Sequence, residues 1–154
     1  MNIVATLEKK RMDKRYLRSV RLLAECMQLF EKRSSASVRR CGLTESQFDI
    51  IATLGNTDGM SCKELGDNTL ITKGTLTGVL DRLEQKALIS RCRGDGDKRQ
   101  MLVKLTDAGD AVFQTAFPNV VTAGQRLFDD YAEEDFAQLE RELQKLKTAL
   151  SKRL

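Results

Sequence analysis

Histidine is entirely absent from this chain of 154 residues. It is the commonest general base in enzymes, so no Ser–His or Cys–His catalytic pair can be built within the chain. Its absence also removes a frequent zinc ligand. The four cysteines form no C-x-x-C pair, which argues against a zinc ribbon or a thioredoxin-type redox site. We therefore predict reduced structural thiols, no metal and no cofactor. The absence of histidine does not by itself exclude catalysis, but without paired thiols or a cofactor loop we predict that the protein is not an enzyme.

Proline and long hydrophobic runs are also scarce. The single proline disfavours an all-β sandwich, which needs many turns, and favours long helices. No apolar run approaches the 18 or more residues of a membrane span, and the N-terminus lacks the hydrophobic core of a signal peptide. These absences predict a soluble, cytoplasmic protein of about one domain, with no membrane partner.

The charge is unevenly distributed, although its net value is only +4. Residues 1–43 carry 11 basic and 4 acidic side chains, and residues 61–105 carry 9 and 6. Residues 106–154 reverse the balance, with 6 basic and 9 acidic side chains. Positive charge in the first and third quarters suits a nucleic acid or another acidic partner, although an ordinary solvated surface would give the same pattern.

Both ends of the chain are predicted to be helical. Apolar residues recur at helical spacing over roughly 12–40, after a short apolar arm at 3–7, and Gly42 ends that helix. A later helix starts at Thr106, runs towards residue 130 and is expected to kink at Pro118. The last helix, about 133–152, carries an apolar stripe with spacings of 3 and 4, formed by Phe136, Leu139, Leu143, Leu146 and Leu150. Such a stripe packs against another helix, in the same chain or in a partner.

Two capping boxes open shorter helices in the middle of the chain. Thr44 with Gln47 begins a helix to about Leu54, and Ser61 with Glu64 begins one to about residue 68. The residues 69–71 then form a connection of the length that a helix-turn-helix uses.

A second helix and a hairpin complete the central motif. Thr72 is placed to cap a helix from Lys73 to about Gln85, whose predicted buried face is Leu76, Val79, Leu80 and Leu83. Short strands at 89–91 and 101–105 flank a charged, glycine-rich tip and form a β-hairpin. The predicted order is helix, helix, short strand, helix, helix, two-stranded hairpin, helix, helix. This order predicts a mainly α fold, a winged helix-turn-helix flanked by long N- and C-terminal helices.

The outward face of the helix 73–85 is suited to DNA. It carries small and hydroxylated residues, which let a backbone approach base edges, while Lys73 and Arg82 can reach phosphates or acceptors. Gly74 and Gly78 each cost about 1 kcal/mol of helix propensity. Close approach to another surface explains that cost, whereas an ordinary solvated helix face does not.

Two ligand motifs can be excluded near the hairpin tip. The run Asp95–Asp97 resembles the start of a calcium loop, but Arg99 and Gln100 stand where an EF-hand needs an oxygen ligand and a glycine. No phosphate-cradling glycine loop is present either.

The chain resembles the MarR family of bacterial regulators. The resemblance covers about 43–110 in motif and the whole chain in helix order. It rests on Leu43-Thr44, Lys63-Glu64-Leu65, the run 71–77, Asp81-Arg82-Leu83-Glu84, Leu88-Ile89, Arg91, Asp97-Lys98-Arg99 and the run 105–109. Ala87 departs from the pattern, because the family usually has glycine after this helix.

The resemblance implies a homodimeric transcriptional regulator, most simply a repressor of a double-stranded pseudo-palindromic DNA operator. Residues 43–106 would bind DNA, and 1–42 with 107–154 would form the dimerisation region. Arg99 would enter the minor groove with its guanidinium held by Asp97. The other predicted DNA-binding residues are Thr72, Lys73, Thr75 and Thr77 in the major groove, together with Arg82, Arg91 and Lys98. A small aromatic or phenolic effector would release the operator.

Two alternatives remain open. Cys26 lies on the first long helix, where a peroxide-sensing branch of the family keeps its reactive cysteine, although beside the predicted core residues Met27 and Phe30 and about six residues from that branch's position. The chain could instead be a helical interaction module that uses the winged motif to dock a protein. Intact basic residues at the hairpin and the helix 73–85 favour DNA.

Overall fold

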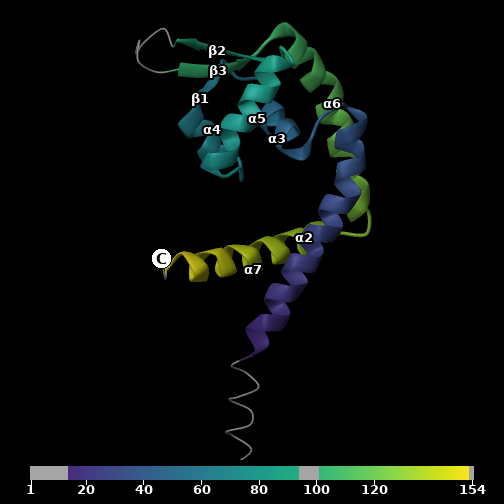
Figure 1. The fold of residues 1–154 in the computed structure, drawn as a ribbon. Helices are drawn as coiled ribbons and strands as arrows, with labels where there is room; N and C mark the ends of the chain where they lie inside the picture. Colours follow the sequence, from purple (N-terminus) through teal and green to yellow (C-terminus); the bar gives the residue numbers. More distant parts are fainter. Residues whose placement is uncertain (1–13, 94–100, 153–154) are drawn as a thin grey trace, which may run out of the picture. The chain divides into compact units, whose positions relative to one another are not determined.

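The structure, a computed structural model, describes residues 14–93 and 101–152. These residues are mostly helical with one small antiparallel sheet (Figure 1), which confirms the predicted mainly α winged helix-turn-helix. The elements are α2 (Arg15–Arg40), α3 (Glu45–Leu54), β1 (Met60–Ser61), α4 (Cys62–Asn68), α5 (Lys73–Gln85), β2 (Ile89–Arg93), β3 (Met101–Leu105), α6 (Asp107–Gln125), a 3-10 turn (Arg126–Phe128) and α7 (Glu133–Ser151). Contacts divide the chain into two compact units, Met1–Val120 and Val121–Leu154.

The helix α2 ends where the sequence predicts. Gly42 has φ +72°, and its amide donates to the carbonyl oxygen of Arg39 at 2.9 Å. The amide of Leu43 reaches back to the carbonyl oxygen of Val38 at 3.4 Å, which completes a Schellman cap. The predicted start of this helix near residue 12 and the apolar arm lie outside the described residues.

Both capping boxes are confirmed. The amide of Gln47 donates to Thr44 Oγ1 at 3.3 Å, and the amide of Thr44 donates to Gln47 Oε1 at 3.1 Å. The amide of Glu64 donates to Ser61 Oγ, and Ser61 donates through its amide and its hydroxyl to Glu64 Oε2, both at 2.8 Å. These bonds favour the charged carboxylate and lower the pKa of Glu64. The helices α3 and α4 therefore begin at positions set by local chemistry.

The sheet has three strands in the order β1-β3-β2, because the predicted short strand before α4 pairs with the predicted hairpin. Met60 in β1 pairs with Val103 in β3, and β2 pairs with β3 from Ile89 opposite Leu105 to Arg93 opposite Met101. The strand β2 is therefore two residues longer than predicted. The predicted turn at the tip lies in 94–100, outside the described residues.

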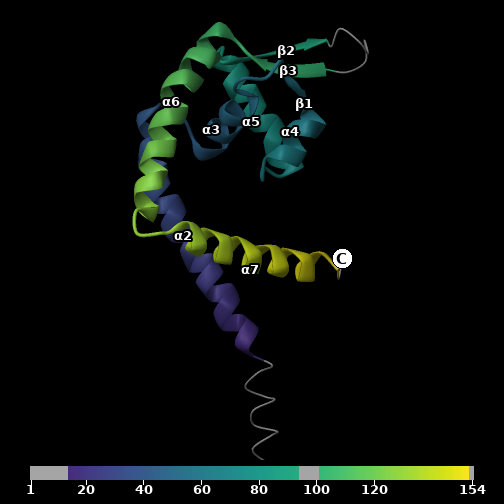
Figure 2. The ribbon, with the colours of Figure 1, turned by 180° about the vertical axis from the view of Figure 1, so that it is seen from behind.

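The hydrophobic core of the first unit lies between α3, α4, α5 and the sheet (Figure 2), with α2 and α6 each contributing side chains. Its members that are at most 2% exposed are Ile50, Ile51, Leu54, Leu65, Leu80, Leu83, Ile89 and Val103. The whole predicted buried face of α5 belongs to this core, which confirms that face. The opposite side of α5 is therefore left outward.

The helix α6 ends at Gln125, and the predicted continuation towards residue 130 is a 3-10 turn instead. Pro118 lies inside the continuous helix, and the expected kink stays a prediction. In the second unit the rings of Phe128, Tyr131 and Phe136 lie 5.2–5.6 Å apart between centroids and fix the turn into α7. None of the described helices is long and apolar enough to cross a membrane.

The cap that follows α5 forms although Ala87 replaces glycine. Ala87 has φ +55°, its amide donates to the Glu84 carbonyl at 2.8 Å, and the amide of Leu88 donates to the Leu83 carbonyl at 3.0 Å. This is again a Schellman cap, but its left-handed residue carries a side chain. Thr106 Oγ1 donates to the Ala87 carbonyl at 2.6 Å, which ties this cap to the start of α6.

We expect Ala87→Gly to raise the free energy of unfolding by about 0.5–1 kcal/mol. A left-handed non-glycine residue costs about 1–2 kcal/mol, part of which is offset by the greater freedom of glycine in the unfolded chain. Urea denaturation measures the change, and DNA affinity should stay constant. A lower unfolding midpoint for Ala87→Gly would show that the cap is relaxed with alanine.

Candidate DNA-binding surface

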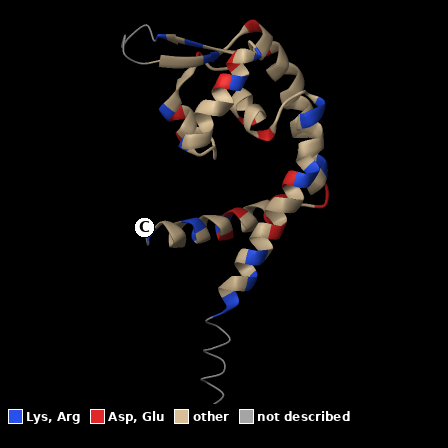
Figure 3. Cartoon of the chain, viewed as in Figure 1, with Lys and Arg blue, Asp and Glu red and all other residues tan. Residues whose placement is uncertain are grey.

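The helix α5 is held by its inner face and displays its outer face to solvent. Leu76, Val79, Leu80 and Leu83 are all at most 4% exposed, packed among α3, α4 and β2. The five residues predicted to contact DNA from this motif are all exposed, namely Thr72, Lys73, Thr75, Thr77 and Arg82. The structure thus brings them together at one surface. In the sequence no charged residue lies between Lys73 and Asp81, and Figure 3 shows a long uncharged stretch in α5.

Thr72 occupies the N-cap position of α5, but its side chain does not bond a backbone amide as the sequence predicted. Its hydroxyl instead lies 3.0 Å from the Thr75 hydroxyl. Either oxygen can donate, so the pair can offer a donor or an acceptor to an incoming group. The N-terminus of α5 therefore presents two hydroxyls and the ammonium of Lys73 side by side.

The two glycines of α5 face open space. A Cβ at Gly74 would meet nothing within 4 Å, and one at Gly78 would meet only Arg82 Nη2 at 3.9 Å. Neither glycine is required by packing within the chain. Their cost in helix propensity therefore calls for a contact outside it, which agrees with close approach to DNA.

We expect Gly74→Ala and Gly78→Ala to stabilise the free protein and weaken DNA binding. Each alanine gains up to about 1 kcal/mol of helix propensity, while its methyl group blocks close approach to the groove. Thermal unfolding and binding titrations on the same variants measure the two opposite effects. Gly124→Ala in α6 is the matched control, because its Cβ would also meet nothing within 4 Å. Unchanged DNA affinity in both α5 variants would show that the glycines do not serve binding.

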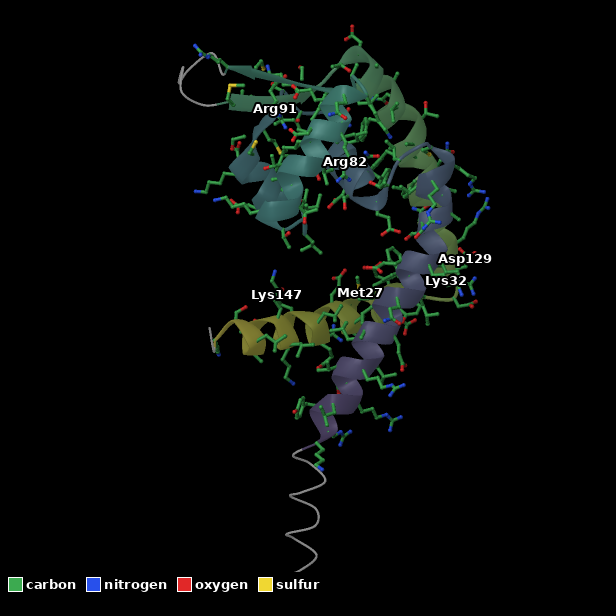
Figure 4. The ribbon with its side chains drawn as sticks, viewed as in Figure 1. Met27, Lys32, Arg82, Arg91, Asp129 and Lys147 are labelled. Atoms are coloured by element: carbon green, nitrogen blue, oxygen red, sulfur yellow. The ribbon has the colours of Figure 1, made fainter. Side chains whose placement is uncertain are left out.

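Arg91 joins the sheet to α5 (Figure 4). Its Nη2 lies 2.6 Å from Asp81 Oδ1 and its Nη1 lies 3.0 Å from Glu84 Oε2, and its side chain is 27% exposed. The hydrogen bond to Asp81 is the main cause that raises the pKa of Arg91, and the charges of Glu84 and Asp81 add to it. Arg91 therefore orients α5 and neutralises two carboxylates beside Arg82. Its predicted contact with DNA stays a prediction.

The remaining predicted site residues, Asp97, Lys98 and Arg99, lie outside the described residues. Cys26 is exposed on α2. Met27 and Phe30 are 47% and 42% exposed, so the prediction that they belong to the core is wrong for the single chain. Within 14–93 and 101–152, no three Cys, Asp or Glu side chains are grouped to hold a metal ion.

Leu70, in the connection between α4 and α5, is not among the residues that the sequence predicts for this surface. Its side chain is 98% exposed, whereas Thr69 is buried and Ile71 packs against the core. A single leucine in a three-residue connection forms no apolar pattern, so nothing in the sequence marks it as exposed. It lies at the same end of α5 as Thr72 and Lys73.

The chain is similar to known bacterial regulators. A model of the MarR family matches residues 43–101. The homoprotocatechuate degradative operon repressor of Escherichia coli is 29% identical over 102 residues, which are 66% of this chain and 69% of that protein. A mutant MarR from E. coli complexed with operator DNA is 26% identical, with a TM-score of 0.76, and the match covers 86% of this chain and 96% of that one. NadR in complex with 4-hydroxyphenylacetate shares the fold, with a TM-score of 0.67 at 22% identity over 80% of this chain and 88% of NadR.

The fold and these similarities define a DNA-binding transcriptional regulator of the winged helix-turn-helix class. The matched part of the chain, residues 43–101, belongs to the MarR family, and most of the chain is similar in fold to regulators of that family. Members of this family are transcriptional regulators and not enzymes.

Proposed function

We propose that this chain is a homodimeric repressor that binds a pseudo-palindromic operator and leaves it when a small aromatic acid binds. The outward face of α5 carries this proposal, because it is exposed, uncharged over two turns and lined with small and hydroxylated residues. The proposed DNA-binding residues are Thr72, Lys73, Thr75, Thr77 and Arg82, with Arg91, Asp97, Lys98 and Arg99 on the wing side.

The N-terminal end of a recognition helix is the part that reaches base edges in the major groove. Thr72 and Thr75 lie at that end of α5 and can hydrogen-bond to base edges or phosphates. Lys73 adds a positive charge next to them. Arg82 lies two turns later and is placed for a phosphate of the backbone, a contact that adds affinity without reading sequence.

The dimer is supported by apolar side chains that the single chain leaves exposed. Leu17 and Val20 in α2 are each 51% exposed, and Leu139 and Leu143 in α7 are 40% and 41% exposed. Exposed apolar side chains repeated along one helix are typical of an interaction site. We therefore assign 1–42 and 107–154 to dimerisation and 43–106 to DNA binding. A two-fold dimer then places two recognition helices on half-sites about 34–36 Å apart.

The class of effector is proposed from two relatives. The E. coli relative is named for an operon that degrades homoprotocatechuate, and NadR was solved with 4-hydroxyphenylacetate bound. Both names contain an aromatic acid. A ligand of this kind, binding the free protein better than the DNA-bound one, would lower operator occupancy by mass action.

Gel-shift titration with DNA from upstream of the chain's own coding sequence tests the proposal. We expect a specific complex at low salt whose affinity falls as salt rises, because phosphate contacts release counterions. Lys73→Ala should weaken binding and lower the salt slope by about 1, without a change in thermal stability. Lys32→Ala, which removes the same charge from an exposed site on α2, should bind like the wild type.

The controls separate the parts of the proposal. Absence of any complex at low salt overturns operator binding, and equal affinity for shuffled DNA overturns sequence specificity. Adding 4-hydroxyphenylacetate should release the DNA, whereas the non-aromatic acid hexanoate should not. Expression of a reporter gene downstream of the bound DNA should fall when the protein is present. An increase in expression would show that the protein is an activator.

A further inference from the structure

Leu70 is the most exposed of the large hydrophobic residues in the described chain. Its side chain is 98% exposed, whereas the next, Tyr16 and Leu150, are 63% exposed. It lies on the connection that leads into the recognition helix α5, two residues before the N-cap Thr72. Leu70 contributes nothing to the core, and full exposure of a leucine gains none of the free energy that burial would give.

The backbone on both sides of Leu70 is fixed. Thr69 is 6% exposed, its hydroxyl donates to the Leu65 carbonyl at 2.7 Å, and its amide donates to the same carbonyl at 3.0 Å. Ile71 packs against the core. Since the residues before and after it are anchored inward, Leu70 is displayed outward from a rigid loop at the base-reading end of α5.

We propose that Leu70 determines sequence specificity by packing against the 5-methyl group of a thymine in each half-site. This inference rests on the proposed operator binding and adds a base preference to it. In the major groove the thymine methyl is the apolar feature of the base edges, and the other groups are hydrogen-bond donors and acceptors. A leucine side chain can neither donate nor accept a hydrogen bond, so against any other edge or a phosphate it would remove water without replacing its bonds.

The neighbouring surface favours the same partner. Thr75 and Thr77 add methyl groups to the exposed face of α5, and no charged side chain stands between Lys73 and Asp81. The open space at Gly74 lets the start of α5 come close to the bases. Residues 74–80 of α5 therefore include no arginine, asparagine or glutamine that would form bidentate bonds to guanine or adenine.

The test starts from duplexes selected by the full-length wild-type chain from a random double-stranded library. In the enriched sequence each thymine is replaced by deoxyuridine, which removes only the 5-methyl group and keeps the pairing edge. We expect one symmetric pair of thymines at which the replacement weakens wild-type binding about fourfold per half-site, and about fifteenfold for both. Leu70→Ala should bind the thymine duplex about as weakly and should not respond to deoxyuridine at that pair.

Lys73→Ala serves as the matched control, because it should weaken both duplexes by the same factor. If Leu70→Ala loses as much affinity as the wild type on deoxyuridine substitution, another side chain contacts the methyl and the inference is wrong. It is also wrong if no deoxyuridine changes affinity, or if Leu70→Ala binds the selected duplex like the wild type, as it would if Leu70 docks a protein. In all three cases a selected duplex still exists and the proposed function stands. If the library yields no enriched duplex, the operator itself is refuted and the inference fails with it.

Discussion

Replacing Leu143 with aspartate in α7 should convert the protein to monomers and abolish operator binding at concentrations where the wild type binds. Leu143 is 41% exposed in the single chain and shares one helical stripe with Leu139 and Leu150. If this stripe forms the proposed dimer contact, the carboxylate loses its water and has no partner, which costs several kcal/mol. In a two-fold symmetric dimer the same carboxylate is buried once in each subunit, so this cost counts twice. The dimer dissociation constant should therefore rise by a factor on the order of a thousand or more.

Sedimentation velocity measures the change, and circular dichroism confirms that the helices remain. Gln138→Asp is the matched control, since it adds the same charge at an exposed position on the other side of α7. Deleting residues 136–154 should likewise leave a monomer or an insoluble chain. A folded Leu143→Asp variant that still sediments as a dimer would place the interface elsewhere, for example on α2 alone.

The parts of the fold that the sequence predicts are those whose cause is local. A capping box is complete within four residues, so Thr44 with Gln47 and Ser61 with Glu64 can be recognised from spacing alone. The buried face of α5 follows from helical periodicity and is confirmed, with Leu83 0% exposed. Once the buried face of α5 is known, the residues on its opposite face, among them Lys73, Thr77 and Arg82, are expected to point outward.

What the sequence does not predict depends on residues that are distant in the chain. Nothing local shows that Met60 pairs with Val103 and adds a third strand to the hairpin. The same is true of Gly109, where a Cβ would lie 1.9 Å from the Leu88 carbonyl oxygen. That contact is set by the packing of α6 across the end of α5 and not by any turn preference.

The role of Arg91 shows the same limit within the site. A basic residue at the wing suggests a phosphate contact, but the fold places its guanidinium on Asp81 and Glu84, ten and seven residues earlier. Charge counting treats these three groups as separate surface charges. In the structure they form one network that holds α5 against β2. We therefore expect Arg91 to affect DNA binding by orienting α5.

Replacing Arg99 with alanine should cost about 1–3 kcal/mol of operator binding, a loss of about 5- to 150-fold. The prediction comes from the sequence, since Arg99 lies between β2 and β3 in 94–100, outside the described residues. A guanidinium on a wing can enter a minor groove, where narrow A·T tracts concentrate negative potential. If it served only as half of an exposed ion pair, its loss would cost about 0–1 kcal/mol of folding stability and no DNA affinity.

Asp97 separates an orienting role from simple charge. The predicted orienting role requires Asp97 and Arg99, two residues apart, to point to the same side of the hairpin, so that the Asp97 carboxylate holds the Arg99 guanidinium in one rotamer. Asp97→Ala should then weaken binding, although it makes the protein more positive. Asp95→Ala is the matched control, because it removes the same charge from the same segment and should leave binding unchanged or slightly tighter. If Asp97→Ala instead binds every duplex more tightly, as Asp95→Ala does, net charge governs the wing and the orienting role is refuted.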